Sequence, residues 1–185
     1  MHIFNIIYTT WFASEVLLNI IFHPGRNDKK GRDKNSLIFI WIVLFFAIYS
    51  GVYISGHFKL LISNHYMIRY MGLVIIVLGM ILRFFSIWSL GRFFTVVVTI
   101  REGHKLKKDG VYKILRHPSY TGALLSFIGF GISLNNWLSL IITNILMLAV
   151  SLYRIKIEEK TLTEHFGKEY LDYKNSTYCI LPWIY

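Results

Sequence analysis

The sequence predicts an all-α integral membrane protein: a bundle of about five transmembrane helices, the last two forming a helical hairpin, with an amphipathic C-terminal helix. Three observations lead to this prediction. Only 16% of the residues are charged and 55% are hydrophobic, whereas soluble globular proteins carry about 25% charged residues. The apolar residues gather in stretches close to the ~20 residues that a helix needs to cross a bilayer. The basic residues gather between those stretches.

The first part of the chain, residues 1–88, predicts three membrane-spanning helices. They cover roughly residues 2–22, 36–55 and 65–88. The N-terminal stretch lacks a preceding basic region and an A-x-A-like cleavage site, which favours a span over a signal peptide. Glu15 lies in the first span and Arg83 in the third. Charges inside spans are functional candidates, although a mutual ion pair or snorkelling to the interface also accounts for them.

The second part, residues 89–185, predicts a polar segment, a helical hairpin and a surface helix in the same single domain. Residues 89–119 are too polar to cross a bilayer, yet their apolar and aromatic content argues against disorder. Two apolar segments, 120–134 and 137 to about 157, flank Asn135 and Asn136 and predict the hairpin. The charged tail 158–174 repeats apolar side chains every three or four residues, which predicts an amphipathic helix on the membrane surface. These side chains are Leu162, Phe166, Tyr170 and Tyr173.

The basic residues also predict the orientation in the membrane. Residues 23–35 hold five basic and two acidic residues, and residues 89–119 hold seven basic and two acidic residues. Two spans separate these segments, so they share one side, which the positive-inside rule assigns to the cytoplasm. The N-terminus is then outside, and the C-terminal tail joins segment 89–119 at the cytoplasmic end. The same charges suit anionic membrane lipids as partners.

Some functional classes are disfavoured by the sequence. The net charge of +10 lies between apolar spans, so no nucleic-acid partner is expected. The one cysteine, Cys179, excludes an internal disulfide. No two histidines have H-x-x-x-H spacing and no carboxylate stands at a ligand-like spacing from a histidine, so no metal site is expected. The glycine patterns of nucleotide-binding loops and of the nucleophile elbow are absent.

Two polar segments at the expected cytoplasmic end carry the candidate site residues. Arg154 and Glu158 are four residues apart and therefore share one face of a helix. An exposed ion pair and a functional pair both fit that spacing. Arg116 and His117 precede the hairpin, and Pro118 suits the first turn of its first helix. An interfacial anchor and a binding site explain this motif equally well.

Two runs of sequence resemble a known family. The run HKLKKDGVYKILRHPSYTG, residues 104–122, resembles the core motif of isoprenylcysteine carboxyl methyltransferases and related membrane phospholipid methyltransferases. The run RIKIEEKTLTEHFGKEYLDYK, residues 154–174, resembles the C-terminal motif of the same family. The two runs keep the family's order and approximate separation. The resemblance covers about residues 90–182, and the N-terminal spans match only in hydropathy.

The resemblance implies a five-helix membrane enzyme that binds S-adenosyl-L-methionine, without a Rossmann domain, in a pocket that faces the cytoplasm. Arg154 and Glu158 are the implied catalytic residues, with Arg116 and Glu159 as adjacent candidates, and Arg154 would also face the substrate. The two lysines among the implied cofactor contacts match by position rather than by residue type, so backbone contacts are expected there. The implied cofactor contacts are His104, Lys105, Leu106, Lys107, Tyr112, His117, Pro118, Ser119, Tyr120 and Glu158.

The acceptor of the methyl group is left open by the resemblance. The nearest analogy is a prenylcysteine-type carboxylate, on a lipophilic or prenylated substrate that reaches the site from the bilayer. A carboxylate needs no base at pH 7, whereas an amine, thiol or hydroxyl would need one, for which Glu158 or Glu159 is the candidate. Phospholipid amines and small hydrophobic molecules are therefore alternatives. The ending FGKEYLDY…LPWIY also resembles NADPH-dependent sterol-type reductases, and a non-enzymatic membrane scaffold is a third alternative.

Overall fold

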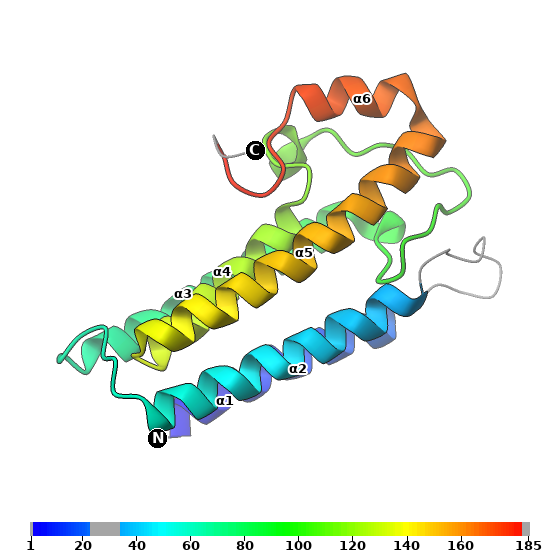
Figure 1. The fold of residues 1–185 in the computed structure, drawn as a ribbon. Helices are drawn as coiled ribbons and strands as arrows, with labels where there is room; N and C mark the ends of the chain where they lie inside the picture. The colour runs from blue at the N-terminus through cyan, green and yellow to red at the C-terminus, as the bar shows by residue number, and fades with distance from the viewer. Residues whose placement is uncertain (1, 23–33, 183–185) are drawn as a thin grey trace.

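In the part of the chain that the structure describes, five long helices run side by side and form the body of the protein (Figure 1). The computed structural model describes residues 2–22 and 34–182. The five helices are α1 (His2–Ile21), α2 (Lys34–His57), α3 (Met67–Leu90), α4 (Pro118–Ser133) and α5 (Trp137–Phe166). Two short 3-10 helices, η1 (Gly91–Phe93) and η2 (Gly110–Lys113), lie between α3 and α4, and α6 (Lys168–Asn175) follows α5. The predicted all-α bundle is confirmed.

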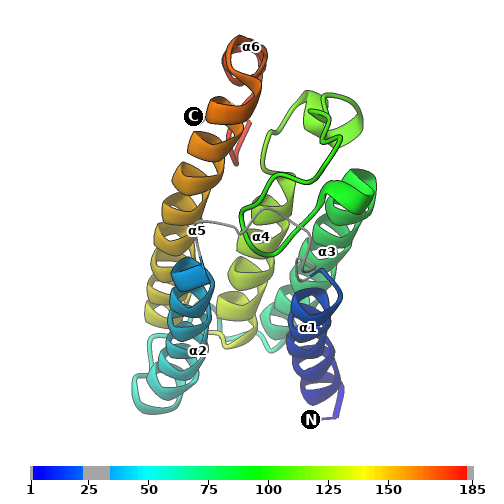
Figure 2. The ribbon, with the colours of Figure 1, turned by 90° about the vertical axis from the view of Figure 1, so that its right-hand side faces the viewer.

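Within the described residues, four helices are long and apolar enough to cross a membrane: α1, α2, α3 and α5. The remaining long helix, α4, has 16 residues, about 24 Å of helix, which is less than the ~30 Å hydrocarbon core. Figure 2 shows that α4 lies between α3 and α5, with α1 beside α3 and α2 beside α5. Because α4 is largely surrounded by protein, its short length exposes little unpaired backbone to lipid.

Small residues line the seam between α3 and α4 and bring their backbones close together. A Cβ atom at Gly79 of α3 would lie 2.6 Å from the carbonyl oxygen of Gly122, and one at Gly129 of α4 would lie 2.5 Å from the backbone N of Ile76. Any larger side chain at these positions would push the helices apart. Close approach through small residues is typical of helix packing in membranes. The seam therefore fixes the position of α4, and with it the residues at the start of α4.

Two asparagines form the tight turn between α4 and α5, as the sequence predicts. Asn135 has a φ of 53°, a region that asparagine enters more readily than most residues. Its amide accepts a hydrogen bond from the backbone N of Ser63 at 3.0 Å and donates one to the Ser63 carbonyl at 2.8 Å. Asn136 caps α5, because its Oδ1 accepts a hydrogen bond from the backbone N of Ser139 at 3.0 Å. The turn is thus tied to the link between α2 and α3.

The structure corrects the predicted end of the last span. α5 continues past the predicted limit near residue 157 and ends at Phe166. Residues 158–166 contain no glycine or proline, so nothing in the backbone stops the helix where its composition turns polar. Gly167 then adopts a φ of 55°, a left-handed conformation that favours glycine. The chain reverses there, and α6 folds back over the end of the bundle (Figure 1).

The predicted single surface helix over 158–174 is therefore wrong in its extent. Leu162 and Phe166 belong to α5, whereas Tyr170 and Tyr173 belong to α6. Both tyrosines are buried, so α6 turns its apolar face onto the protein. The segment between α3 and α4, α6 and residues 176–182 gather at one end of the bundle (Figure 1). Most of the basic segment 23–35, which entered the topology prediction, lies outside the described residues.

Candidate active site

A cavity extends from the polar end of the bundle into its apolar interior. Residues from α1, α2, α4 and α5 line its apolar part, and the segment between α3 and α4 closes it at the polar end together with α5 and α6. A cavity with apolar walls and a few convergent polar groups is typical of a small-molecule site. The apolar lining includes Trp11, Leu18, Trp41, Leu44, Phe127 and Met147.

Most of the site residues predicted from the sequence line this cavity. Two of them do not: Pro118 begins α4, and Glu159 turns toward Arg116. The structure therefore brings the two sequence motifs together around one space, although they lie more than 30 residues apart. The predicted residues that line the cavity are His104, Lys105, Leu106, Lys107, Tyr112, Arg116, His117, Ser119, Tyr120, Arg154 and Glu158.

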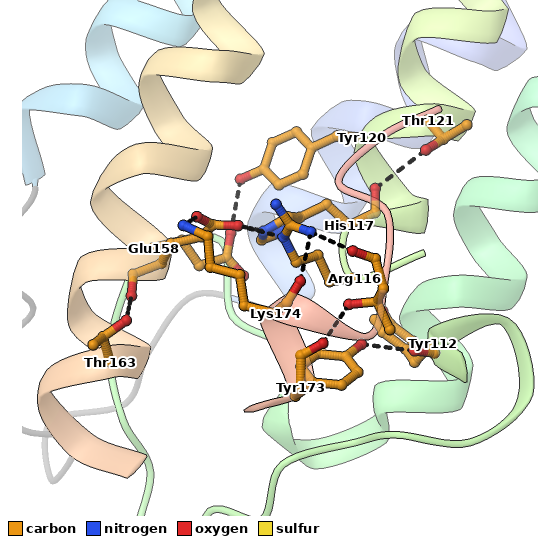
Figure 3. Close-up of polar contacts among 11 residues, drawn as sticks. Tyr112, Arg116, His117, Tyr120, Thr121, Glu158, Thr163, Tyr173 and Lys174 are labelled. Carbon is orange, nitrogen blue, oxygen red and sulfur yellow. Dashed lines mark hydrogen bonds and ion pairs between the residues drawn. The ribbon is translucent and has the colours of Figure 1, made fainter. Parts of the chain in front are cut away.

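Glu159 is the centre of a partly buried polar cluster beside the cavity, and its partners Arg116, His117 and Lys174 are labelled in Figure 3. Its Oε1 accepts hydrogen bonds from Nε of Arg116 at 2.6 Å and lies 3.3 Å from Nε2 of His117. Its Oε2 lies 2.6 Å from Nζ of Lys174. Charge-assisted bonds of this kind are strong when they are shielded from water. Glu159 thus joins the start of α4, α5 and α6.

The segment after α6 holds the Arg-His-Pro motif from its other side. The backbone N of Arg116 donates to the carbonyl of Tyr178 at 2.9 Å. The backbone N of His117 donates to the carbonyl of Cys179 at 3.1 Å. The guanidinium of Arg116 also donates to the carbonyl of Thr177 at 2.6 Å. The bond from Arg116 N, together with a bond from the backbone N of Tyr178 to the carbonyl of Ile114 at 3.0 Å, forms a short parallel bridge between Leu115 and Tyr178. The segment satisfies backbone groups that would otherwise be buried without partners.

Two tyrosines connect η2 to its neighbours. The hydroxyl of Tyr173 on α6 donates to the carbonyl of Tyr112 at 2.7 Å, and the hydroxyl of Tyr112 donates to the carbonyl of Ser86 on α3 at 3.2 Å. Burial raises the pKa of both phenols well above the ordinary value, so both stay protonated and keep donating. Tyr112, which lines the cavity, is held from two sides.

Glu158 and Arg154 face the cavity from one side of α5. The hydroxyl of Tyr120 donates to Oε2 of Glu158 at 3.1 Å (Figure 3). Arg154 is buried and donates to the hydroxyl of Ser36 on α2 and to the carbonyl of Val96. These contacts place a carboxylate near the polar end of the cavity and a guanidinium one turn deeper. The spacing of four residues predicted this shared face.

His104 lies in the wall of the cavity between two aromatic rings. Its imidazole stacks on Phe93, with centroids 4.9 Å apart, and meets the edge of Phe166 at 5.6 Å. Its Nδ1 is buried and has no hydrogen-bond partner. Burial lowers the pKa of His104, and the nearby His165 lowers it further. The imidazole is therefore neutral at pH 7 and has a free polar atom.

Glu15 and Arg83, the two charges predicted inside spans, form an ion pair. Nε of Arg83 lies 2.7 Å from Oε1 of Glu15, and Nη2 lies 2.8 Å from Oε2. Both residues line the cavity. Of the two explanations that the sequence left open, mutual pairing is confirmed.

The cluster around Glu159 brings three metal-ligating residue types together. Ligand atoms of His117, Glu159 and Cys179 lie within 4.8 Å of one another. The sequence spacing gave no sign of this grouping, because folding brings α5 against the start of α4. The donor set still does not suit a metal, because Arg116 and Lys174 already occupy the Glu159 oxygens. Burial also raises the pKa of the Cys179 thiol, and a thiol binds metals poorly unless it is ionised.

Sequence reasoning missed the residues that surround the two motifs. Ser36 and Val96, which bind Arg154, and residues 176–180 carry no sequence signal of a site. The aromatic residues around position 93 argue in the sequence only against disorder. A polar residue at the start of an apolar span, such as Ser36, is the kind of signal that could have indicated a buried partner.

The fold and the cavity define a helical membrane bundle with a site that joins an apolar interior to a polar end. The chain belongs to the phospholipid methyltransferase family, because residues 67–169, more than half of its length, match the model of that family. This result agrees with the resemblance found in the sequence.

Curated relatives and a solved structure are similar to the chain over part of their length. Protein-S-isoprenylcysteine O-methyltransferase B of Arabidopsis thaliana is 38% identical over 125 residues, which are 66% of this chain and 64% of the relative. The Saccharomyces cerevisiae protein-S-isoprenylcysteine O-methyltransferase is 36% identical over 116 residues, 62% of this chain and 48% of the relative. A solved structure of a eukaryotic intramembrane Ras methyltransferase, an isoprenylcysteine carboxyl methyltransferase, matches with a TM-score of 0.62 and 28% identity, covering 80% of this chain and 51% of that chain. The chain thus spans about half to two thirds of the length of these proteins.

Proposed function

We propose that this protein is a membrane methyltransferase that uses S-adenosyl-L-methionine to methylate the carboxylate of a lipophilic, prenylcysteine-type acceptor. The observation that carries the proposal is the cavity, which has an apolar interior and a polar end lined by both sequence motifs. The relatives are named for this reaction, and the proposal extends their activity to a chain that spans only part of their length.

The polar end of the cavity has groups that fit the cofactor. The cofactor supplies an electrophilic methyl group on a sulfonium centre and also carries an ammonium and a carboxylate. Glu158 offers a carboxylate to the cationic groups, and the buried Nδ1 of His104 has no protein partner. A buried polar atom without a protein partner is available to a bound molecule. We assign the cofactor contacts to the cavity-lining residues of the first motif together with Glu158.

The apolar interior suits the tail of the acceptor, and Arg154 suits its carboxylate. Arg154 lies between the apolar walls and Glu158 along α5, so it would orient an acceptor whose tail points into the bundle. A guanidinium binds a carboxylate through two parallel hydrogen bonds and so fixes its direction. The role of the chain in this scheme is to orient the acceptor oxygen and to exclude water from the cavity.

The carboxylates that line the cavity already have partners, which favours an acceptor that needs no base. Glu15 is paired with Arg83, and Glu158 accepts from Tyr120. A carboxylate is ionised at pH 7 and can be methylated without losing a proton. A phospholipid amine is the second candidate acceptor, since neutral His104 has a free nitrogen and an amine acceptor would require a group that takes its proton.

We further propose that the polar end of the cavity faces the cytoplasm and that the N-terminus is outside. Segment 89–119 holds seven basic and two acidic residues, and the structure places this segment at the same end as α6. The positive-inside rule then supports a cytoplasmic position for both. The cofactor would reach the site from water and the lipid-tailed acceptor from the bilayer.

A methyl-transfer assay with radiolabelled S-adenosyl-L-methionine tests the proposed reaction. The acceptors are a prenylcysteine analogue with a free carboxylate, the same analogue as its methyl ester, phosphatidylethanolamine, and small hydrophobic thiols and phenols. Transfer to the free carboxylate and not to the ester supports the proposal. Transfer to phosphatidylethanolamine alone makes the amine the acceptor. Binding of NADPH instead of S-adenosyl-L-methionine points to a reductase and ends the proposal.

Site variants test the cofactor assignment separately. Glu158→Gln and His117→Ala are expected to weaken cofactor binding at least roughly tenfold, the loss typical of a charged hydrogen bond. Glu102→Gln, a change at an exposed residue of the polar segment, is the control and should bind as wild type does. Wild-type affinity in both site variants would show that the cofactor lies elsewhere.

A further inference from the structure

The Glu15–Arg83 pair connects α1 to the part of α4 that lies next to the cavity. Nη1 of Arg83 donates to the carbonyl oxygen of Ser119 at 3.1 Å and lies 3.2 Å from its hydroxyl. On the other side of the guanidinium, Nη2 donates to Oε2 of Glu15 at 2.8 Å, and Nε lies 2.7 Å from Oε1 as an ion pair. One guanidinium thus joins α1, α3 and the first turn of α4.

Burying the charges of Glu15 and Arg83 at this position costs free energy, and a role in the site would explain why they are there. Both residues lie within helices long and apolar enough to span a membrane, where ionised side chains are rare. Their side chains keep 14% and 19% of their surface exposed, and both residues line the cavity. Hydrophobic side chains would pack α1 against α3 without burying charge. The bond to Ser119 is what such side chains could not provide.

We propose that Glu15 and Arg83 are positioning residues that hold the first turn of α4, and so Ser119 and Tyr120, in the arrangement that binds the cofactor. Glu15 fixes the plane of the guanidinium, and Nη1 then holds Ser119. Tyr120, the next residue, keeps its hydroxyl 3.1 Å from Glu158. This inference rests on the proposed function, because it assigns the cofactor to these residues.

Two conservative substitutions distinguish this positioning role from an effect of charge alone. Arg83→Lys keeps the positive charge but cannot form a two-pronged bond to Glu15 and also hold Ser119, because an ammonium lacks the planar fork of a guanidinium. Glu15→Gln keeps the size of the side chain but presents at most one good acceptor to the guanidinium. Both changes should leave α1 in place and loosen Ser119.

Isothermal titration of the detergent-purified protein with S-adenosyl-L-methionine tests the proposal. Arg83→Lys and Glu15→Gln are each expected to raise the Kd about tenfold, as the loss of a shielded charged hydrogen bond does. Arg69→Lys is the matched control, because Arg69 is also on α3 but lies beside Tyr66 and outside the cavity lining. Its Kd should stay within roughly twofold of wild type.

Two further measurements distinguish positioning from general destabilisation. In the Ser119→Ala background, Arg83→Lys should raise the Kd by a smaller factor than in wild type, because part of its partner is already gone. Without cofactor, the amides of residues 119–123 should exchange hydrogen faster in Arg83→Lys than in Arg69→Lys. If Arg83→Lys raises the Kd by the same factor in the wild-type and Ser119→Ala backgrounds, and leaves amide exchange unchanged, the pair only stabilises the bundle.

The outcomes also separate this inference from the proposed function. A wild-type protein that binds no S-adenosyl-L-methionine refutes the proposed function. A wild type that binds it, with Arg83→Lys and Glu15→Gln binding equally well, refutes only the positioning role. If Arg83→Lys does not fold, Glu15→Gln decides the question, because it leaves the guanidinium in place.

Discussion

Nε of Arg116 lies 2.6 Å from Oε1 of Glu159, and this ion pair joins the motif before α4 to α5. Side-chain exposure is only 6% for Arg116 and 12% for Glu159, so water screens the pair poorly. The second carboxylate oxygen is bound by Lys174 after the chain has reversed at Gly167. Three segments distant in sequence therefore share one carboxylate next to the candidate active site.

Loss of that carboxylate should destabilise the protein. Glu159→Gln leaves Arg116 and Lys174 without a charged partner, and breaking a buried ion pair typically costs about 3 kcal/mol or more. We expect a clear drop in the thermal unfolding midpoint in detergent. Glu169→Gln is the control, because its pair with Lys108 is exposed and should contribute less than about 1 kcal/mol. Similar midpoints in the two variants would contradict the structural role of Glu159.

The end of the cavity should set the length of the acceptor tail. The lining stops at one depth on four helices, at Trp11, Leu44, Phe127 and Met147. At this level the rings of Trp11 and Phe127 are in contact, with centroids 5.0 Å apart. Trp11→Ala would deepen the cavity. The ratio of kcat/KM for a longer over a shorter prenyl tail is then expected to rise roughly tenfold.

A lipid-facing aromatic residue gives the control for tail length. Phe46 on α2 is exposed on the outside of the bundle, so Phe46→Ala removes a ring without changing the cavity. It should leave the tail-length ratio unchanged. If Trp11→Ala and Phe46→Ala give the same ratio as wild type, the tail does not reach Trp11.

Tyr173→Phe should weaken the contact between α6 and η2 at the polar end of the cavity. The change removes the hydrogen bond from α6 to the carbonyl of Tyr112, a bond worth about 1 kcal/mol. Amide hydrogen exchange in residues 110–116 is expected to accelerate severalfold, because α6 then holds η2 less firmly. Tyr153→Phe, at an exposed position of α5, is the control and should not change that exchange. Slow exchange in both variants would mean that α6 is held by other contacts.

Cofactor binding should depend on pH through His104. Burial, followed by the charge of His165, lowers the pKa of His104 below its ordinary value, which is about 6.5. The imidazole is thus neutral at pH 7 and gains a proton only as the pH falls below about 6.5. An imidazolium would repel the cationic cofactor, so the affinity should be flat above that pH and fall below it. Nearby Glu158 and Arg101 act on the same group in opposite directions.

Titration calorimetry at a series of pH values measures this dependence. His104→Gln cannot titrate in this range, so its affinity should change less between neutral and acidic pH than that of wild type. A wild-type affinity that increases on acidification would mean that a charged imidazole assists binding, the opposite of the expected sign.

The sequence carried enough information for the helices and for the two motifs. Apolar stretches of membrane length predicted α1, α2 and α3 within a few residues, because lipid demands a continuous apolar surface. The Asn135–Asn136 turn was predictable because two polar residues interrupt an apolar run. The end of α5 was not predictable from hydropathy, because a helix can leave the membrane and continue in water.

The roles of neighbouring residues depended on packing that no local pattern contains. Glu158 and Glu159 are adjacent, and adjacent residues on an α-helix point about 100° apart. The rotation of α5 about its own axis, relative to α4, decides that Glu158 lines the cavity and that Glu159 binds Arg116. The Glu15–Arg83 pair joins residues 68 positions apart. Sequence alone left pairing and snorkelling equally acceptable.

The contacts of residues 174–180 have a consequence for biogenesis. This segment supplies Lys174 to Glu159 and backbone carbonyls to Arg116 and His117, yet it is translated after all five long helices. During synthesis the Arg-His-Pro motif therefore lacks these partners until the segment leaves the ribosome. Nascent chains halted before residue 174 should insert their helices into the membrane and still lack an ordered polar end. Membrane insertion and completion of the site are thus separate events in the life of the chain.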